Sequence, residues 1–425
     1  MKRRWTVCFL GLGAALALAG CKPEAAWSPD STRLAVDPRG AMLVLDLKTR
    51  KFRNYSPGKH LAINPAWSPD GSRLLYYRAT SPKPGTITAL ELVSLDPGTG
   101  RVSPLVPRVP FSLPKEGELN LGIASSPDMI GQFLAAEWSP DGKRLVYTAL
   151  EADNTVLYVA DAAGGGGKRI TPAGKSAFHP VWSPDSRQLA YFTSAAPVGP
   201  TDPERKEAPA LLEVVPVEGG QPRIVWNETR KERVGWPLPQ PTWTPDGQSL
   251  LCTAILPPEG EQKKDPNGPF AAPFEVWQVP VAGGEPTRLN TSSGASPLAH
   301  LAGPRLAFFE MSSAPNQEKI WVRLLEPPYR ESRRIAELTK QSFGPRMAAA
   351  EEVDQIPLPV LSPDGKWVAV PMAPKKGNVG ALLLVPTSGG KPQLVEMPLP
   401  GPPAPARPAG GKKPARGKKP AAPRK

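Results

Sequence analysis

The sequence has little of the chemistry that familiar enzymes use. Its 425 residues include only three histidines, His60, His179 and His300, and three cysteines. It contains no Gly-x-Ser-x-Gly elbow, no Gly-x-x-x-x-Gly-Lys phosphate loop and no His-Glu-x-x-His zinc motif. We therefore expect a protein that is not an enzyme, with no catalytic residues, no metal and no cofactor. A hydrolase or lyase with an unfamiliar site is the alternative.

The body of the chain has little net positive charge, although the formal net charge of the whole chain is +13. Lys2, Arg3 and Arg4 supply three charges and the stretch after Glu396 supplies eight, which leaves about +2 for the residues between them. A basic groove across the folded body is therefore not supported, and we expect no nucleic-acid partner.

Long helices are also disfavoured, because 57 residues are proline and 39 are glycine. Hydrophobic residues make up 40% of the chain and charged residues 21%, which is enough apolar material for a sizeable core. The composition thus favours strands and turns and excludes wholesale disorder.

Residues 1–20 have the parts of a secretory signal peptide: a basic start, a short uncharged stretch and small residues before Cys21. The sequence Leu18-Ala19-Gly20-Cys21 resembles the lipobox of bacterial lipoproteins, which implies that Cys21 is acylated and begins the mature chain. A plain signal peptide or membrane anchor with a chance cysteine is the alternative. Lys22 follows the cysteine, and in Gram-negative lipoproteins this implies an outer-membrane anchor facing the periplasm.

The remaining cysteines then have no disulfide partner. Cys8 leaves with the signal peptide, and Cys21 carries lipid, so Cys252 stands alone. Cys252 lies in an apolar run suited to a strand, and we expect a buried, inert thiol.

Six copies of one motif form the strongest pattern in the chain. Trp-Ser-Pro-Asp begins at residues 27, 67, 138 and 182, Trp-Thr-Pro-Asp at 243, and Leu-Ser-Pro-Asp at 361. A seventh, eroded copy at 297–308 has Ala299 in place of tryptophan and His300-Leu301-Ala302 in place of Ser-Pro-Asp. Proline presets the turn and aspartate accepts hydrogen bonds from nearby amides, so each copy predicts a hairpin. A third alternating apolar strand follows every copy, and a glycine turn with a fourth strand follows most.

Seven units of four antiparallel strands predict an all-β fold, a seven-bladed β-propeller. The repeats resemble the WSPDG repeats of the TolB-type propeller family, which also occur in prolyl-oligopeptidase-like enzymes. The resemblance covers roughly residues 25–398. It implies structural roles for the motif residues Trp27, Asp30, Trp67, Asp70, Trp138, Asp141, Trp182, Asp185, Trp243, Asp246 and Asp364. The first copy begins on an inner strand and the last ends on an outer strand, so we expect blades one and seven to close the ring by packing.

We therefore divide the chain into a signal peptide (1–20), a propeller (21–398) and a tail (399–425). The tail is rich in proline, alanine, lysine and arginine, with eight positive charges and no aromatic residue, and we expect it to be disordered. Its plausible targets are anionic lipid or a cell-wall polymer; solubilisation alone is the alternative.

A candidate binding site lies where the inner strands would meet the channel. Asn64, His179, Gln240 and Ser296 each precede a proline near the start of a repeat, and they gather around one opening if the inner strands line the channel. Solvated side chains around a funnel are the alternative interpretation.

The functional expectation is a non-catalytic, lipid-anchored propeller of a bacterial cell envelope that serves as an interaction platform for envelope proteins. A binder of envelope polysaccharide or of a small ligand at the channel mouth is the alternative.

Overall fold

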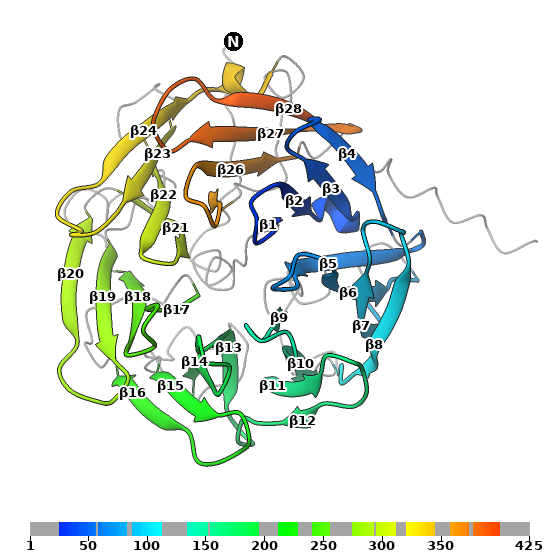
Figure 1. Cartoon of the computed structure of the whole chain (residues 1–425), viewed down its shortest axis with the longest axis vertical. Helices are drawn as coiled ribbons and strands as arrows, with labels where there is room; N and C mark the ends of the chain where they lie inside the picture. Colours follow the sequence, from blue (N-terminus) through cyan, green and yellow to red (C-terminus); the bar gives the residue numbers. More distant parts are fainter. Residues whose placement is uncertain are drawn as a thin grey trace, which may run out of the picture.

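The protein is described from a computed structural model that places residues 25–56, 58–82, 87–112, 134–151, 154–194, 211–227, 240–255, 274–292, 295–311, 320–344, 358–373 and 377–399. These residues form seven four-stranded antiparallel sheets arranged around a central opening (Figure 1). The prediction of an all-β, seven-bladed propeller is confirmed. Cys21 and the tail beyond Leu399 lie outside the described residues.

Each blade is a meander whose strands follow one another in sequence. The first four blades comprise β1 Ala25–Trp27, β2 Arg33–Val36, β3 Leu43–Asp46 and β4 Lys51–Asn54; β5 His60–Trp67, β6 Leu74–Thr80, β7 Ala89–Leu95 and β8 Val102–Val109; β9 Ala136–Trp138, β10 Arg144–Glu151, β11 Asn154–Asp161 and β12 Lys168–Arg169; and β13 Ser176–Trp182, β14 Gln188–Ser194, β15 Leu211–Pro216 and β16 Arg223–Asn227.

The last three blades comprise β17 Thr242–Trp243, β18 Ser249–Ile255, β19 Phe274–Pro280 and β20 Thr287–Ser292; β21 Ala295–Ala302, β22 Arg305–Met311, β23 Ile320–Leu325 and β24 Arg333–Leu338; and β25 Val360–Leu361, β26 Trp367–Met372, β27 Val379–Pro386 and β28 Gln393–Pro398. Two short 3-10 helices, η2 Pro38–Gly40 and η4 Lys340–Phe343, complete the described elements. No helix in these ranges is long and apolar enough to cross a membrane.

The core is divided among the junctions between blades. Seven apolar clusters occur in the described residues, and each one joins side chains of two neighbouring blades. Tyr76 packs toward blade one while its neighbour Tyr77 packs toward blade three, because successive strand residues point to opposite faces of the sheet. A single blade would expose both apolar faces, so the closed ring is what buries them.

The ring closes by packing between blades one and seven without exchange of a strand, as expected. Trp27, Leu43 and Leu45 share a cluster with Leu382 and Leu384. The Trp27 indole donates to the Val360 carbonyl at 3.0 Å, across 333 positions of the sequence.

The alternation of strand direction gives the disc two unlike faces. The turns from first to second and from third to fourth strand lie on one face, here called the turn face. The links from second to third strand, and from one blade to the next, lie on the opposite face, here called the connection face. All the turns of the turn face belong to the described residues, whereas every internal break between the described ranges falls in a link of the connection face.

Candidate functional site

The motif turns are built around their aspartate and serine side chains. In the first blade the Ser28 hydroxyl donates to Asp30 Oδ1 at 2.6 Å and accepts from the Arg33 amide at 2.9 Å. The Thr32 amide donates to the same carboxylate oxygen at 3.1 Å. The serine or threonine bond to aspartate recurs at Ser68–Asp70, Ser139–Asp141, Ser183–Asp185, Thr244–Asp246 and Ser362–Asp364. The Oδ1 atom of each carboxylate thus accepts two hydrogen bonds within its own turn.

These hydrogen bonds lower the pKa of the turn carboxyls, because they favour the charged form. The Ser68 hydroxyl, followed by the Ser72 amide and hydroxyl, lowers the pKa of Asp70 to about 2. The pKa values of the aspartates in the other five turns are lowered as well. At Asp364 burial opposes the shift, but hydrogen bonds from Ser362 and Lys366 outweigh it. The turn aspartates therefore remain ionised well into the acid range.

The motif tryptophans connect one blade to the next. Trp67 Nε1 donates to the Ala26 carbonyl at 3.0 Å, and Ala26 itself precedes Trp27 in the neighbouring inner strand. Trp27, Trp138 and Trp243 make the equivalent bond. In each case the indole N–H donates to the carbonyl of the residue just before the motif of the preceding blade. Trp182 Nε1 is buried and has no hydrogen-bond partner in the described residues.

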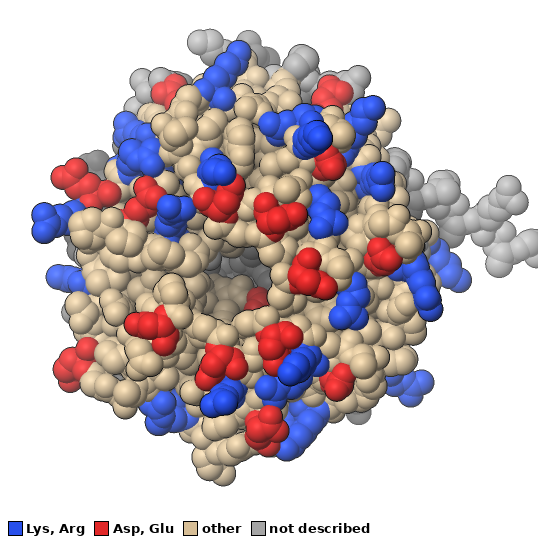
Figure 2. Space-filling model, in the orientation of Figure 1, with Lys and Arg blue, Asp and Glu red and all other residues tan. Residues whose placement is uncertain are grey.

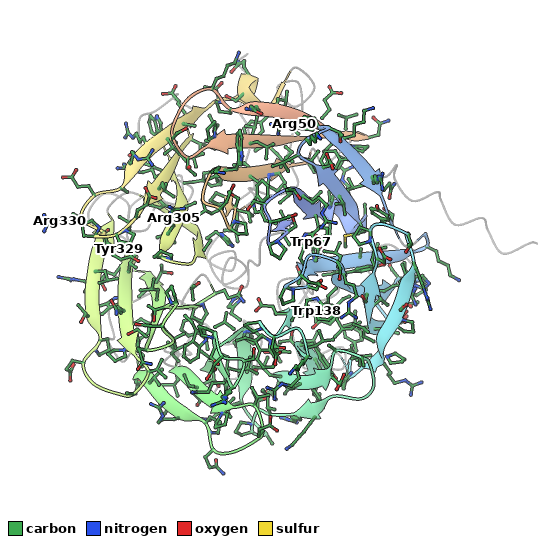
Figure 3. All side chains as sticks on the ribbon, in the orientation of Figure 1. Arg50, Trp67, Trp138, Arg305, Tyr329 and Arg330 are labelled. Carbon is green, nitrogen blue, oxygen red and sulfur yellow. The ribbon has the colours of Figure 1, made fainter. Side chains whose placement is uncertain are left out.

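Arginines six positions after the motif tryptophan form a second connection between blades. Arg33 Cζ lies 4.4 Å from the centroid of Trp67, and its Nη2 donates to the Gly71 carbonyl at 2.7 Å. Arg73 lies over Trp138 at 4.4 Å and Arg144 over Trp182 at 5.7 Å. Figure 3 shows Trp67 and Trp138 beside the inner strands of neighbouring blades. A guanidinium over an indole face adds a cation–π contact to the hydrogen bond.

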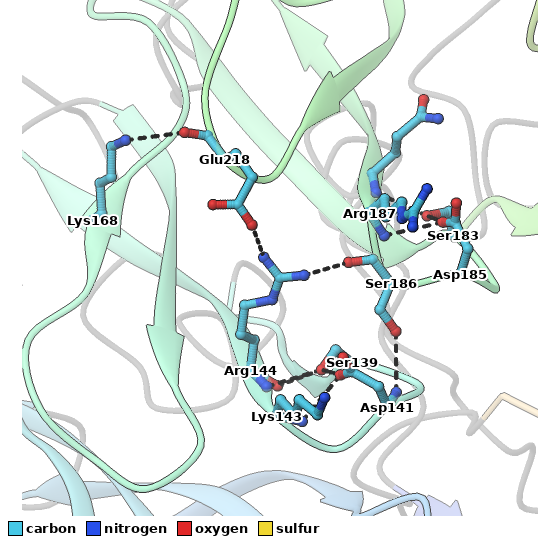
Figure 4. Close-up of polar contacts among 11 residues, drawn as sticks. Ser139, Asp141, Lys143, Arg144, Lys168, Ser183, Asp185, Ser186, Arg187 and Glu218 are labelled. Carbon is cyan, nitrogen blue, oxygen red and sulfur yellow. Dashed lines mark hydrogen bonds and ion pairs between the residues drawn. The ribbon is translucent and has the colours of Figure 1, made fainter.

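The junction of blades three and four shows how closely the turns are fixed (Figure 4). Arg144 donates to the Ser186 carbonyl at 2.7 Å and to Glu218 Oε1 at 2.6 Å. The Asp141 amide donates to the Ser186 hydroxyl at 3.1 Å, and the Asp364 amide donates likewise to the Ser31 hydroxyl at 3.0 Å. Ser31 and Ser186 take the left-handed turn position, with φ of 57° and 61°, where the other motif turns have glycine.

The sequence analysis missed these arginines and serines. An arginine recurs six positions after the tryptophan in three copies, and serine replaces glycine after Asp30 and Asp185. The recurrence of these residues at fixed positions in the repeat could have identified them from the sequence.

The result is a ring of fixed charges on the turn face. The proline and aspartate of each intact motif are exposed, and Figure 2 shows acidic side chains spaced around the central opening, with basic side chains farther out. No group of three potential metal ligands occurs among the residues that the structure places. The ring is therefore a surface with a repeated pattern of charge and shape.

Two of the predicted channel-mouth residues, Asn64 and His179, lie inside the channel wall. They are 5% and 7% exposed, and both have left-handed backbones, with φ of 55° and 51°. The Asn64 side-chain amide donates to the Leu134 carbonyl at 2.6 Å, and its backbone amide donates to Asp37 Oδ2 at 2.6 Å. The register of β5 and β13 shifts at these positions. Both residues thus shape the inner strand at a bulge rather than project into an opening.

Gln240 remains partly exposed and connects three blades. Its Nε2 donates to the Glu137 carboxylate of blade three and to the Pro180 carbonyl of blade four, the latter at 3.0 Å. Ser296 lies on β21, where the register with β22 also shifts. Of the four predicted residues, Gln240 is the one whose described side chain is available at the channel wall, beside Glu137.

Seven four-stranded antiparallel blades define a seven-bladed β-propeller, and solved structures similar to the chain include proteins described as TolB. No family model matches the chain. A protein described as TolB from Agrobacterium tumefaciens is 17% identical, with a TM-score of 0.41, over 70% of this chain and 88% of that one. An oligogalacturonate lyase in complex with manganese is 14% identical, with a TM-score of 0.53, over 89% of this chain and 88% of that one.

A curated relative is the uncharacterized peptidase YuxL of Bacillus subtilis (strain 168). It is 27% identical over 135 residues, which make up 30% of this chain and 18% of YuxL. The chain thus matches less than a fifth of that relative's length.

These comparisons contradict the expectation that the protein is not an enzyme. A relative in sequence is named as a peptidase, and a neighbour in structure is a lyase. The expectation relied on the absence of familiar motifs, but a propeller can carry a site composed of side chains from several blades, which no local motif would reveal.

Proposed function

We propose that the protein is a bacterial cell-envelope propeller, anchored by lipid at Cys21, that binds an envelope protein on its turn face. The observation that supports this proposal is the set of six exposed Pro-Asp turns, each held by hydrogen bonds within its own blade and in several cases to the next blade. A surface fixed before binding loses little conformational freedom on association, which favours specific contact with a protein.

Site-specific photo-crosslinking in intact cells tests this proposal. A photoreactive amino acid replaces Ala163, which is exposed in a turn of the turn face, and the matched variant carries it at Ala173, exposed in a link of the connection face. We expect Ala163 to give a discrete protein adduct. Equal adduct patterns from both positions, or no adduct from Ala163, would contradict the proposal.

A second candidate function is binding of an envelope oligosaccharide at the channel wall, with turnover as its enzymatic form. The partly exposed pair of Gln240 and Glu137 favours it, because an amide and a carboxylate together can recognise sugar hydroxyls. Oligogalacturonate is one probe, and binding and cleavage are measured for the unaltered chain and for Gln240→Ala. A loss of either signal in the variant would support this candidate, and inert behaviour of both proteins toward a glycan array would exclude it.

A further inference from the structure

The chain enters the propeller at the centre of the connection face. β1 is the innermost strand of the first blade, and it runs into the Ser28 turn, where the Ser28 amide donates to the Arg33 carbonyl at 2.8 Å. Because that turn lies on the turn face, Ala25, at the other end of β1, lies toward the connection face. Cys21 precedes Ala25 by four residues, so the segment between them spans at most about 14 Å.

The chain leaves the propeller on the same face. β28 follows the turn at Gly389 and Gly390 on the turn face and pairs with β27 until Pro398 lies opposite Val379. The Leu399 amide then donates to the Asn378 carbonyl at 2.9 Å, in the link that precedes β27. Arg39 of blade one donates to the Gly377 carbonyl of that link at 2.8 Å, which ties the exit to the entry blade.

The two ends therefore place two membrane-directed features on one side of the disc. The residues after Leu399 carry eight positive charges and no acidic side chain.

We infer that the connection face lies against an anionic lipid surface, with the channel axis roughly perpendicular to the bilayer and the turn face directed away from it. The inference rests on the proposed lipid anchor at Cys21. A tether of about 14 Å from an inner strand holds the disc by its centre and so favours a face-on position. Basic residues near an anionic bilayer strengthen its binding, and a lipid chain combined with a basic segment gives stable anchoring.

Fluorescence energy transfer from a labelled residue to lipid acceptors tests this orientation. The lipidated protein is reconstituted on vesicles of phosphatidylethanolamine and phosphatidylglycerol, with a donor at Ala173→Cys or Ala163→Cys. These are matched substitutions at exposed positions on either side of β12. Cys252 is fully buried and does not compete for the label. We expect transfer from position 173 to be at least about twofold more efficient than from position 163. Equal or reversed efficiencies on bound protein would overturn the orientation.

A second measurement separates this inference from the anchoring on which it rests. If neither labelled protein sediments with vesicles and Cys21→Ser behaves identically, the lipid anchor itself is wrong. If the protein sediments, replacing Lys412, Lys413, Lys418 and Lys419 with glutamine is expected to reduce the transfer efficiency from position 173 at low salt. The same replacement should have little effect on vesicles of phosphatidylcholine. An unchanged efficiency on the anionic vesicles would contradict the contribution of the tail.

Discussion

Blade six differs from the other six blades in how it is joined to its neighbours. Five blades have a tryptophan at the first motif position, whereas blade six has Ala299 and blade seven has Leu361 there. Both junctions of blade six therefore lack a motif tryptophan. Tyr329 provides an outer contact instead: its hydroxyl donates to the Pro304 carbonyl at 2.8 Å, and Asn290 of blade five donates to the Tyr329 carbonyl at 2.5 Å. Between blades six and seven, His300 Nδ1 accepts from the Leu361 amide at 3.3 Å. The ring thus tolerates different contacts at each junction if the apolar surfaces remain covered.

The largest loss of stability is expected when the aromatic side chain is removed from a junction with a motif tryptophan or from the junction that contains Tyr329. Trp67→Ala and Tyr329→Ala each leave a cavity between two blades, because both side chains are less than 10% exposed. We expect each to lower the free energy of unfolding by about 3–5 kcal/mol, the usual range for truncating a buried aromatic residue. Chemical denaturation measures both. A loss below about 1 kcal/mol in Tyr329→Ala alone would show that Tyr329 does not replace the missing tryptophan.

Acid should weaken the junction at His300 in particular. Burial of the ring lowers the pKa of His300 to about 4, whereas the unfolded chain has the ordinary pKa of about 6.5. Below pH 6.5 the unfolded state binds a proton that the folded state does not bind, so stability falls as the pH decreases from 6.5 toward 4, by up to about 3 kcal/mol. Unfolding of the unaltered chain and of His300→Gln is compared at several pH values. The variant should lose most of this slope, and an equal slope in both proteins would contradict the assignment.

The prediction from sequence succeeded where the determinants were local. A proline and an aspartate at fixed places in each copy determine a hairpin, and the alternation after it determines a strand, so the number of blades followed from counting copies. The contacts between blades could not be predicted this way, because Ser31 meets the Asp364 amide only after the ring has closed. Asn64 and His179 were expected at an opening because the sequence does not show that a bulge and a left-handed backbone place them in the wall.

Two turn glycines have the same backbone conformation but different surroundings. Comparing their alanine variants separates the loss of stability caused by the left-handed backbone from the loss caused by a clash at the blade junction. Gly365 and Gly247 have φ of 69° and 68° at equivalent positions. A Cβ at Gly247 would meet nothing closer than Pro184 Cδ at 3.7 Å, whereas at Gly365 it would overlap the guanidinium of Arg305 from blade six. Both alanine variants should lose about 1–2 kcal/mol because of the left-handed backbone. Gly365→Ala should lose about 1 kcal/mol more, as Arg305 is displaced, and Arg305→Ala should remove this difference in thermal unfolding.

The smallest expected effect compares two buried tryptophans that differ in their indole hydrogen bond. Arg144 lies over Trp182, and phenylalanine keeps an aromatic face for that contact. Trp27 and Trp182 are 7% and 6% exposed, but only Trp27 donates its indole N–H, to Val360 across the seam of the ring. Replacing either with phenylalanine removes similar apolar area, so the two losses from packing should nearly cancel in the comparison. Trp27→Phe also leaves the Val360 carbonyl without its partner, and it should therefore be less stable than Trp182→Phe by about 1 kcal/mol. Denaturant unfolding of the two variants gives this difference directly. Equal losses would mean that the indole hydrogen bond contributes nothing measurable to the seam.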